Sequence, residues 1–313
     1  MAEKILIMGE SGTGKSASIR NCNPETTAII NPVGKPLPFR GAKNFTTLNG
    51  ITDADMICDF MKDQVNEGKK IIIVDDFQYI LAIPYMDRIK ETGWDKYNDF
   101  GSNYFKIIDI CGDLPDDVCV YYLTHCETLD SGLTTVKLIG KLLREKITVE
   151  GLFTIVLRTG VNEGKYYFFT QNSGKDTVKS PMGMFDAFSI ENDLNYVDAK
   201  IRNYYEMAGA VSDDEMAKLD ESKAGEVEKT EGRRRRSRRS NVEETKTDVN
   251  EEVKDHFVNI ANEAIDQLPS TEEPTKDPFD VPQTEPEKIE LPASDPMPLP
   301  EERPARRRKQ RNE

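Results

Sequence analysis

The fold is decided by Lys4-Ile-Leu-Ile-Met-Gly-Glu-Ser-Gly-Thr-Gly-Lys-Ser16, in which a short apolar run leads directly into the pattern G-x-x-x-x-G-K-S. Its glycines are expected to take φ values closed to other residues, so that successive N–H groups can surround a β-phosphate. The lysine can reach the β- and γ-phosphate oxygens, and the serine hydroxyl can bind Mg²⁺. The pattern therefore predicts a site for a nucleoside triphosphate and Mg²⁺, formed by Gly9, Glu10, Ser11, Gly12, Thr13, Gly14, Lys15 and Ser16.

The residues on either side of this phosphate-binding loop support the same interpretation. The apolar run before it predicts a strand, and residues 17–23 favour a helix that ends before Pro24. We therefore expect the loop to lie at a helix N-terminus, where unpaired N–H groups and the helix dipole favour an anion.

A second motif follows at residues 70–76. Lys70-Ile-Ile-Ile-Val-Asp75-Asp76 is an apolar strand that ends in two carboxylates, as in a Walker B motif. We expect Asp75 to hold Mg²⁺ through water. The alternative is a solvated turn after a buried strand, but the upstream phosphate-binding loop favours the Walker B interpretation.

Composition divides the chain of 313 residues into two parts. Only two aromatic residues, Phe257 and Phe279, lie beyond residue 210, whereas ten of the 17 prolines do. Such a segment cannot offset its ordering entropy by burying apolar surface. We therefore expect a folded domain over residues 1–208 and a disordered, charged, proline-rich tail over 209–313, with a helix-compatible segment at 250–268.

The net charge of −14 argues against a protein that coats polyanions with its whole surface, so any nucleic-acid contact must come from local basic patches. The five cysteines form no C-x-x-C pair and the two histidines complete no zinc site at a recognised spacing, so we expect reduced thiols. No signal peptide precedes the loop, and no apolar run approaches the roughly 18 residues of a membrane span. These features predict a cytoplasmic protein without a membrane partner.

Apolar strands alternate with helix-compatible segments along the first part of the chain, which predicts an α/β fold with a mainly parallel sheet. The candidate strands are 3–8, 27–31, 70–75, 118–124, 152–158 and 166–170. The last two are joined by Asn162-Glu-Gly164 and are expected to form a hairpin.

The order of these motifs resembles a RecA/AAA-type P-loop core. A strand at 27–31 intervenes between the P-loop strand and the Walker B strand, and the strand at 118–124 ends in Thr124-His125. In those families a polar residue at the end of the strand after Walker B senses the γ-phosphate, a role that the resemblance assigns to Thr124 or His125. The alternative for His125 is a capping or surface histidine.

Later segments point to one group within that class. These segments are the stretch with Trp94, Tyr97 and Tyr104, then Thr124-His-Cys-Glu127, Glu150-Gly-Leu-Phe-Thr-Ile-Val-Leu157 and Lys179-Ser-Pro-Met-Gly-Met-Phe185. With the P-loop they resemble, over residues 3–190, the bacteriophage RecA-like ATPases described as AAA-family or phage nucleotide-binding proteins, some of which are grouped with single-strand annealing recombinases. The resemblance implies a RecA-like P-loop core that binds ATP, and the lack of an N-K-x-D guanine signature also favours adenine.

The resemblance also implies contacts with single-stranded DNA and with a neighbouring subunit. Loops follow the Walker B strand and the strand at 118–124, at the positions of the two DNA-binding loops of RecA. Their cations and aromatic faces suit single-stranded DNA, and the candidate contacts are Trp94, Lys137, Lys141 and Arg144. Lys175 and Lys179 follow the hairpin, where RecA-like proteins direct lysines at the neighbouring subunit's nucleotide, so a homo-oligomer is expected. The alternatives are a tryptophan in the core and solvated surface lysines.

The chain departs from RecA at the residue that activates water. RecA carries a glutamate at the end of the strand after the P-loop helix, whereas here that strand ends Ile29-Ile-Asn-Pro32. Asp76, next to the Walker B aspartate as the catalytic acid is in AAA proteins, is the best remaining candidate for the base. The alternative is that Asp76 only caps a turn.

Two functions remain open. The first is an ATPase that assembles on single-stranded DNA and promotes annealing or strand pairing in phage recombination and replication, in the host cytoplasm. The second is a nucleotide-switched loader or assembly factor that binds a protein partner rather than DNA. In the tail, cationic clusters at 233–239 and 303–311 favour nucleic acid, and helical spacing at 250–268 favours a partner such as a single-strand-binding or replication protein. A charge-balanced solubilising tail is the alternative.

Overall fold

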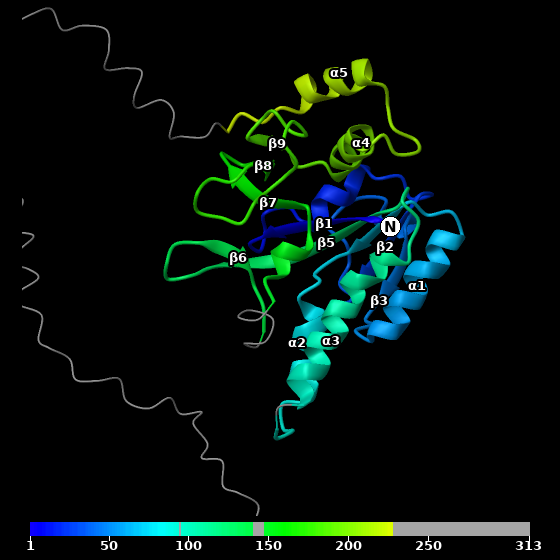
Figure 1. Cartoon of the computed structure of the whole chain (residues 1–313), viewed down its shortest axis with the longest axis vertical. Helices are drawn as coiled ribbons and strands as arrows, with labels where there is room; N and C mark the ends of the chain where they lie inside the picture. Colours follow the sequence, from blue (N-terminus) through cyan, green and yellow to red (C-terminus); the bar gives the residue numbers. More distant parts are fainter. Residues whose placement is uncertain (94, 140–146, 228–313) are drawn as a thin grey trace, which may run out of the picture. The chain divides into compact units, whose positions relative to one another are not determined.

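A mixed β-sheet runs through the centre of the fold (Figure 1). The computed structural model describes residues 1–93, 95–139 and 147–227. Within them the strand order is β3-β2-β4-β5-β1-β7-β8-β9, and β6 pairs with β5. The strands are β1 (Glu3–Gly9), β2 (Thr27–Asn31), β3 (Thr46–Asn49), β4 (Ile71–Val74), β5 (Cys119–Thr128), β6 (Thr134–Val136), β7 (Ile155–Asn162), β8 (Lys165–Phe169) and β9 (Ser189–Glu191). β1 to β5 and β7 pair in parallel, whereas β6, β8 and β9 pair antiparallel with their neighbours.

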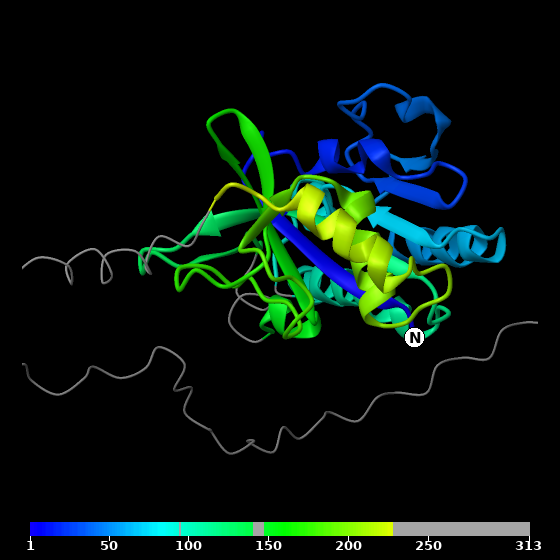
Figure 2. The ribbon, with the colours of Figure 1, turned by 90° about the horizontal axis from the view of Figure 1, so that it is seen from above.

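Helices cover both faces of this sheet, because successive strand side chains point to opposite faces. Leu6 and Met8 pack on one face with α1, α2 and α3, whereas Ile5 and Ile7 pack on the other with α4. Figures 1 and 2 show α4 and α5 on one side of the sheet and the first three helices on the other. The helices are α1 (Ala54–Asn66), α2 (Tyr79–Asp87), α3 (Asp95–Asp109), α4 (Leu194–Tyr204) and α5 (Asp213–Lys223). Burial on both faces explains why the central strands are almost wholly apolar.

The strands expected from the sequence are all present, and the mainly parallel α/β sheet is confirmed. β3, β6 and β9 are absent from the expected set, because three or four residues carry too little periodicity to be recognised. In the sheet, β5 separates the P-loop strand β1 from the Walker B strand β4, while β2 lies on the other edge of β4. Residues 27–31 therefore lie between the P-loop strand and the Walker B strand in the sequence but not in the sheet.

The β7–β8 hairpin is confirmed, and its turn explains the Glu-Gly pair. Glu163 and Gly164 have φ values of 51° and 79°, and Asn162 pairs with Lys165 across the turn. Two consecutive positive φ values are the pattern of a type I′ turn, whose twist matches that of the flanking strands.

Two of the helical segments are unusual, and the first of them differs from expectation. A 3-10 helix, η1 (Ser16–Asn21), follows the phosphate-binding loop in place of the α-helix expected over residues 17–23. The Ser18 hydroxyl donates to the Lys15 carbonyl at 2.6 Å and competes with an α-helical bond. Pro84 lies inside α2, although proline lacks the N–H that a helix interior uses. Because η1 has only six residues, the helix dipole expected at the phosphate-binding loop contributes little to anion binding.

The folded domain continues beyond residue 208. Met216 of α5 is 2% exposed, and the Tyr196 hydroxyl of α4 donates to Asp220 of α5 at 2.7 Å. Ser212 and Glu215 form a capping box at the start of α5. The expected boundary at 208 is therefore too early, because a mostly charged helix can dock through one buried methionine and a few polar contacts.

The cationic clusters and the segment 250–268 belong to residues 228–313, which lie outside the described residues. No helix within the described ranges is long and apolar enough to cross a membrane.

Candidate nucleotide site

The phosphate-binding loop joins β1 to η1 and owes its shape to its glycines. Gly12 and Gly14 have φ values of 80° and 95°, in the left-handed region that favours glycine. Gly9 does not adopt a positive φ, but a Cβ there would lie 1.9 Å from Thr159 Oγ1. The expectation that all three glycines supply positive φ is therefore wrong for Gly9, where the close approach of β7 requires glycine instead.

Lys15 is buried inside the loop, with 6% of its surface exposed. Its Nζ donates to the carbonyls of Gly9 and Glu10, both at 2.9 Å. Burial lowers the pKa of Lys15, and the charges of Asp76 and Asp75 oppose that shift. The cation is thus held by two neutral carbonyls while it faces two carboxylates.

A tight corner after β4 fixes the two aspartates. Asp75 N–H donates to the carbonyl of Ile30 on β2 at 2.8 Å, and Phe77 N–H donates to that of Leu123 on β5 at 2.7 Å. The buried Phe77 ring stacks on Tyr104, with centroids 4.0 Å apart. Asp76 is held between these anchors at a φ of 60°, a left-handed conformation that aspartate tolerates better than most residues.

Ser16 and Asp75 meet although 59 residues separate them in sequence. Ser16 Oγ donates to Asp75 Oδ1 at 2.9 Å, and the aspartate is fully buried. Its Oδ2 has no hydrogen-bond partner in the described part of the chain. Burial, and then the charge of Asp76, raise the pKa of Asp75 to about 6.

This arrangement fits Mg²⁺, which proteins bind through one or two carboxylates together with phosphate and water oxygens. The serine hydroxyl and the unpartnered carboxylate oxygen supply two such ligands. The described residues contain no group of three or more His, Cys, Asp or Glu side chains that could hold a metal. A metal here would therefore depend on phosphate oxygens, as expected for a nucleotide site.

Asp76 has a different environment from its neighbour. Its Oδ2 accepts from Lys35 Nζ, and its Oδ1 lies 3.6 Å from Nε2 of His125. Burial alone would raise the pKa of Asp76, but the contacts with His125 and Lys35 lower it to about 2. Asp76 is thus ionised and paired with the cationic Lys35, whereas the buried negative charge of Asp75 has little compensation.

The two candidates at the end of the strand after Walker B occupy different positions. Thr124 is fully buried, and its hydroxyl has no hydrogen-bond partner among the residues described. His125 pairs with Gly9 in the register of β5 and β1, and its side chain faces Asp76. Of the two, only His125 lines the pocket described next.

A pocket of about 380 Å³ lies over the loop and draws its walls from distant segments. Its lining includes residues expected from the sequence, namely Ser11, Gly12, Gly14, Lys15, Ser16, Asp76 and His125. It also includes residues that the motifs do not reveal, namely Ala17, Lys35, Pro38 and Tyr166. Of these, Lys35 could have been suspected from its position just after β2, because ligands of parallel sheets bind beyond the carboxyl ends of the strands.

The other loop residues support the pocket rather than line it. Thr13 Oγ1 donates to the Glu10 carbonyl at 2.7 Å and lies 2.6 Å from Thr159 Oγ1. The contact between Thr13 and Thr159, and the close approach of Gly9 to Thr159, hold the loop against the neighbouring strand β7.

A second hollow of about 480 Å³ adjoins the first. The two share Ala17 and Tyr166 in their linings, and the second also contains Arg20 and Asn192. Tyr166 is 47% exposed, so one face of its ring is available to a ligand. The hollow over the loop bears Lys15 and Lys35, and the second hollow combines the rings of Tyr166 and Tyr167 with the charged Arg20, Lys165 and Glu191.

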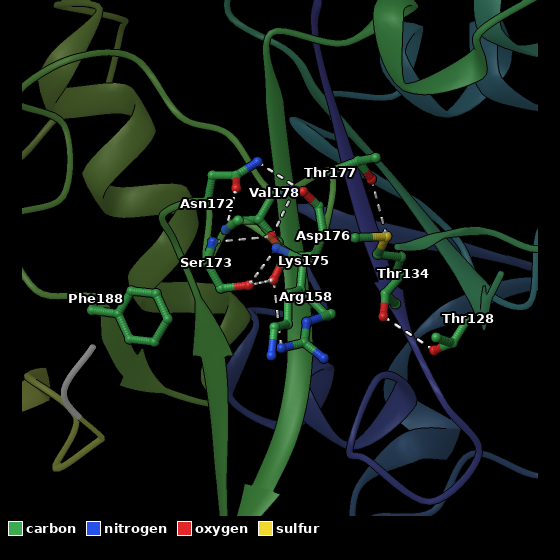
Figure 3. Close-up of polar contacts among 12 residues, drawn as sticks. Thr128, Thr134, Arg158, Asn172, Ser173, Lys175, Asp176, Thr177, Val178 and Phe188 are labelled. Carbon is green, nitrogen blue, oxygen red and sulfur yellow. Dashed lines mark hydrogen bonds and ion pairs between the residues drawn. The ribbon is translucent and has the colours of Figure 1, made fainter. Parts of the chain in front are cut away.

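Lys175 and Lys179 are not among the residues that line the pocket of their own chain. Lys175 is exposed in the turn 172–178, which folds around the carboxylate of Asp176 beside Arg158 (Figure 3). Asp176 Oδ2 lies 3.6 Å from Arg158 Nη2. Lys179 forms two backbone hydrogen bonds with β7. Their action on a neighbouring subunit stays a prediction.

Of the four candidate DNA contacts, the structure describes Lys137, while Trp94, Lys141 and Arg144 lie outside the described residues. Lys137 is exposed, and its N–H donates to the His125 carbonyl at 2.9 Å. Lys137 is therefore hydrogen-bonded to β5 at His125, the residue of that strand that lines the pocket.

A scan against protein-family models and a search of the curated proteins gave no match for this chain. The interpretation of the site therefore rests on its own residues and geometry.

Proposed function

We propose that the protein binds ATP with Mg²⁺ in the pocket over the P-loop and hydrolyses it, as a RecA-like ATPase. The observation that carries the proposal is the convergence of three segments, residues 9–16, Asp75-Asp76 and His125, around one pocket. A phosphate-binding loop alone occurs in many contexts, but its serine is here bonded to a buried aspartate that follows β4, a strand separated from β1 by β5.

The strand order supports the RecA-like part of the proposal. Because β5 lies between β1 and β4, its residues Thr124 and His125 stand between the P-loop and the Walker B corner, before β5 continues to Thr128. This is the position from which a polar side chain could respond to the terminal phosphate. The adjoining hollow beside Tyr166 suits the nucleoside, since every base offers a face for stacking.

The residues then divide the chemistry as follows. The loop N–H groups and Lys15 hold the phosphates, while Ser16 would bind Mg²⁺ directly and Asp75 would hold it through water. Bound Mg²⁺ would neutralise charge on the transferred phosphoryl group. Asp76 accepts a proton from water as the water oxygen bonds to the γ-phosphorus, and the bond to the β–γ bridging oxygen breaks to leave ADP and phosphate.

Calorimetric titration of the full chain with ATP and Mg²⁺ tests the binding step. We expect Lys15→Ala to abolish binding and to leave the fold intact, because the lysine supplies charge to the phosphates and is not part of the apolar core. Lys218→Ala, on the exposed surface of α5, is the matched control. Unchanged ATP affinity in Lys15→Ala would contradict the proposal.

We propose single-stranded DNA as the partner of this ATPase, on the resemblance described above. The bond from Lys137 N–H to His125 supports this, because it joins a candidate DNA contact to the pocket. ATP turnover measured with and without single-stranded DNA separates the two candidate functions. Stimulation is expected for an ATPase that assembles on DNA, whereas a nucleotide-switched loader that binds a protein partner would show none.

A further inference from the structure

Lys35 is the charged residue of the pocket lining to which the proposed function assigns no role. It lies on the connection between β2 and β3, and its Nζ contacts Asp76 Oδ2. Its side chain is 46% exposed, whereas that of Asp76 is 2% exposed. The lysine, on its flexible four-carbon stem, can therefore change partner while the carboxylate stays in place.

The turn that carries Lys35 is built by Asn31, a buried residue at the end of β2. Asn31 Oδ1 accepts from Gly34 N–H at 3.0 Å, and its Nδ2 donates to the Lys35 carbonyl at 2.6 Å. Gly34 has a φ of 71°, a conformation that glycine adopts without strain. The main chain at Lys35 is thus fixed beside the pocket, and the freedom to move belongs to the side chain.

Two lysines and two carboxylates meet at the pocket. The lining holds Lys15 and Lys35, which face the paired carboxylates of Asp75 and Asp76. The loop and Lys15 bind the phosphates from one wall. Lys35 approaches from another wall, on the side of Asp76, where the terminal phosphate and the attacking water have to meet the base.

We propose, on the basis of the triphosphate site inferred above, that Lys35 is a second phosphate-binding lysine, which leaves Asp76 for the terminal phosphate and so frees that carboxylate for the attacking water. In the absence of triphosphate the lysine occupies the base. Lys35 Nζ contacts Asp76 Oδ2, so that oxygen becomes available to the attacking water only when the lysine departs. Nucleotide binding and activation of the base are thereby one event.

Titration of the full chain with ATP and with ADP, each with Mg²⁺, tests the phosphate contact. We expect Lys35→Ala to weaken ATP binding about tenfold to a hundredfold, the range for a hydrogen bond to a charged group, and to affect ADP much less. Lys35→Arg should retain most of the ATP affinity, because it keeps the charge. Lys43→Ala, an exposed lysine on the same connection, is the matched control and should bind both nucleotides like the parent. Equal losses for ATP and ADP, or no loss, would overturn the proposal.

A double-mutant cycle tests the exchange of partners. Asp76→Asn removes the competing carboxylate and retains a residue that tolerates the φ of 60°, so we expect it to increase ATP affinity several-fold. Combined with Lys35→Ala, the same substitution should give little increase. An increase of the same size in both backgrounds would mean that Asp76 acts on the phosphates directly, and the exchange would be wrong.

The parent and Lys15→Ala distinguish this inference from the proposed function. If the parent does not bind ATP, or if Lys15→Ala binds it equally well, the triphosphate site itself is wrong. If both behave as expected while Lys35→Ala matches the parent, the site stands and only the role of Lys35 falls. Melting curves of each variant show whether the fold is retained.

Discussion

The two ends of the sheet bury charge in different ways. At the amino end of the strands, Arg202 Nε donates to Asp198 Oδ2 at 2.6 Å, and its Nη1 and Nη2 donate to the carbonyls of Asp117 and Lys70 at 2.9 and 3.0 Å. The other oxygen of Asp198 accepts from the Tyr121 hydroxyl at 2.8 Å. This arginine–aspartate pair has its hydrogen-bonding groups met by the protein itself.

At the carboxyl end the protein leaves polar groups unmatched. Asp75 Oδ2, Gln78 Nε2 and the Thr124 hydroxyl are buried without a hydrogen-bond partner in the described ranges. An unpaired buried polar atom costs free energy, so natural folds keep few of them. Thr27 Oγ1 and Asp117 Oδ1 are likewise unmatched at the amino end, so the contrast concerns the charged pair itself. Arg202 and Asp198 fasten α4 to the strand ends, whereas Asp75 lies beside the P-loop with one oxygen that the proposed ligand would meet.

Loss of the base should give the largest effect at the carboxyl end. We expect Asp76→Asn to retain ATP binding and to slow turnover about 10²–10⁴-fold, because the amide cannot accept the proton from water. Steady-state ATPase rates at saturating ATP measure it. Asp198→Asn, at the other end of the sheet, should leave the turnover of the folded protein near the parental rate. A parental rate in Asp76→Asn would place the base elsewhere, with Glu10 and Glu127 as the next candidates.

The opposite result is expected at the amino end. Arg202→Ala should lower the free energy of unfolding by about 3–5 kcal/mol, because it leaves the buried carboxylate of Asp198 without its charged partner. Urea denaturation measures the loss, and ATP affinity below the transition should match the parent. Arg40→Ala, at an exposed arginine, is the control. A stable Arg202→Ala protein that fails to bind ATP would contradict the view that Arg202 serves stability and not nucleotide binding.

Asp75→Asn should separate stability from function at one residue. The pKa of Asp75 is raised to about 6, so the folded protein retains a proton that the unfolded chain loses between pH 4 and 6. Stability is therefore lost as pH rises through that window, by about 2–3 kcal/mol for a shift of this size. The opposite contribution of Asp76, whose pKa is about 2, is complete by pH 4.

We thus expect Asp75→Asn to be more stable than the parent at pH 7.5 without nucleotide and metal, and equal to it at pH 4. Urea denaturation in the presence of a chelator measures both values. The same variant should lose Mg²⁺-dependent ATP binding. A variant less stable than the parent at pH 7.5 would contradict the view that this carboxylate is held at a cost to the fold.

The smallest effect concerns Tyr166, which is half exposed beside the pocket. Tyr166→Ala should weaken ATP binding about fivefold to tenfold, the lower end of base–aromatic stacking, and leave the urea midpoint unchanged. Tyr166→Phe keeps the ring and serves as the control. Equal affinity in the alanine and phenylalanine variants would move the nucleoside away from the second hollow.

The local parts of this protein could be predicted from its sequence alone. The P-loop, the Walker B strand and the turn at Glu163-Gly164 are encoded by residues that lie next to one another, and the expected strands were recognisable because burial on both faces makes them apolar runs. The sequence also predicted that the sheet is mainly parallel, since strands alternate with helical segments.

The tertiary structure decided what depends on contacts between distant segments. Only the sheet order, with β5 between β1 and β4, brings His125 beside Asp76, and only the β2–β3 connection brings Lys35 to the same carboxylate. Gly9 is required by Thr159 of another strand, and α5 joins the domain through Met216, although its sequence is mostly charged. Spacing along the chain fixes neighbours within a turn or a strand, whereas these contacts arise from how separate elements pack.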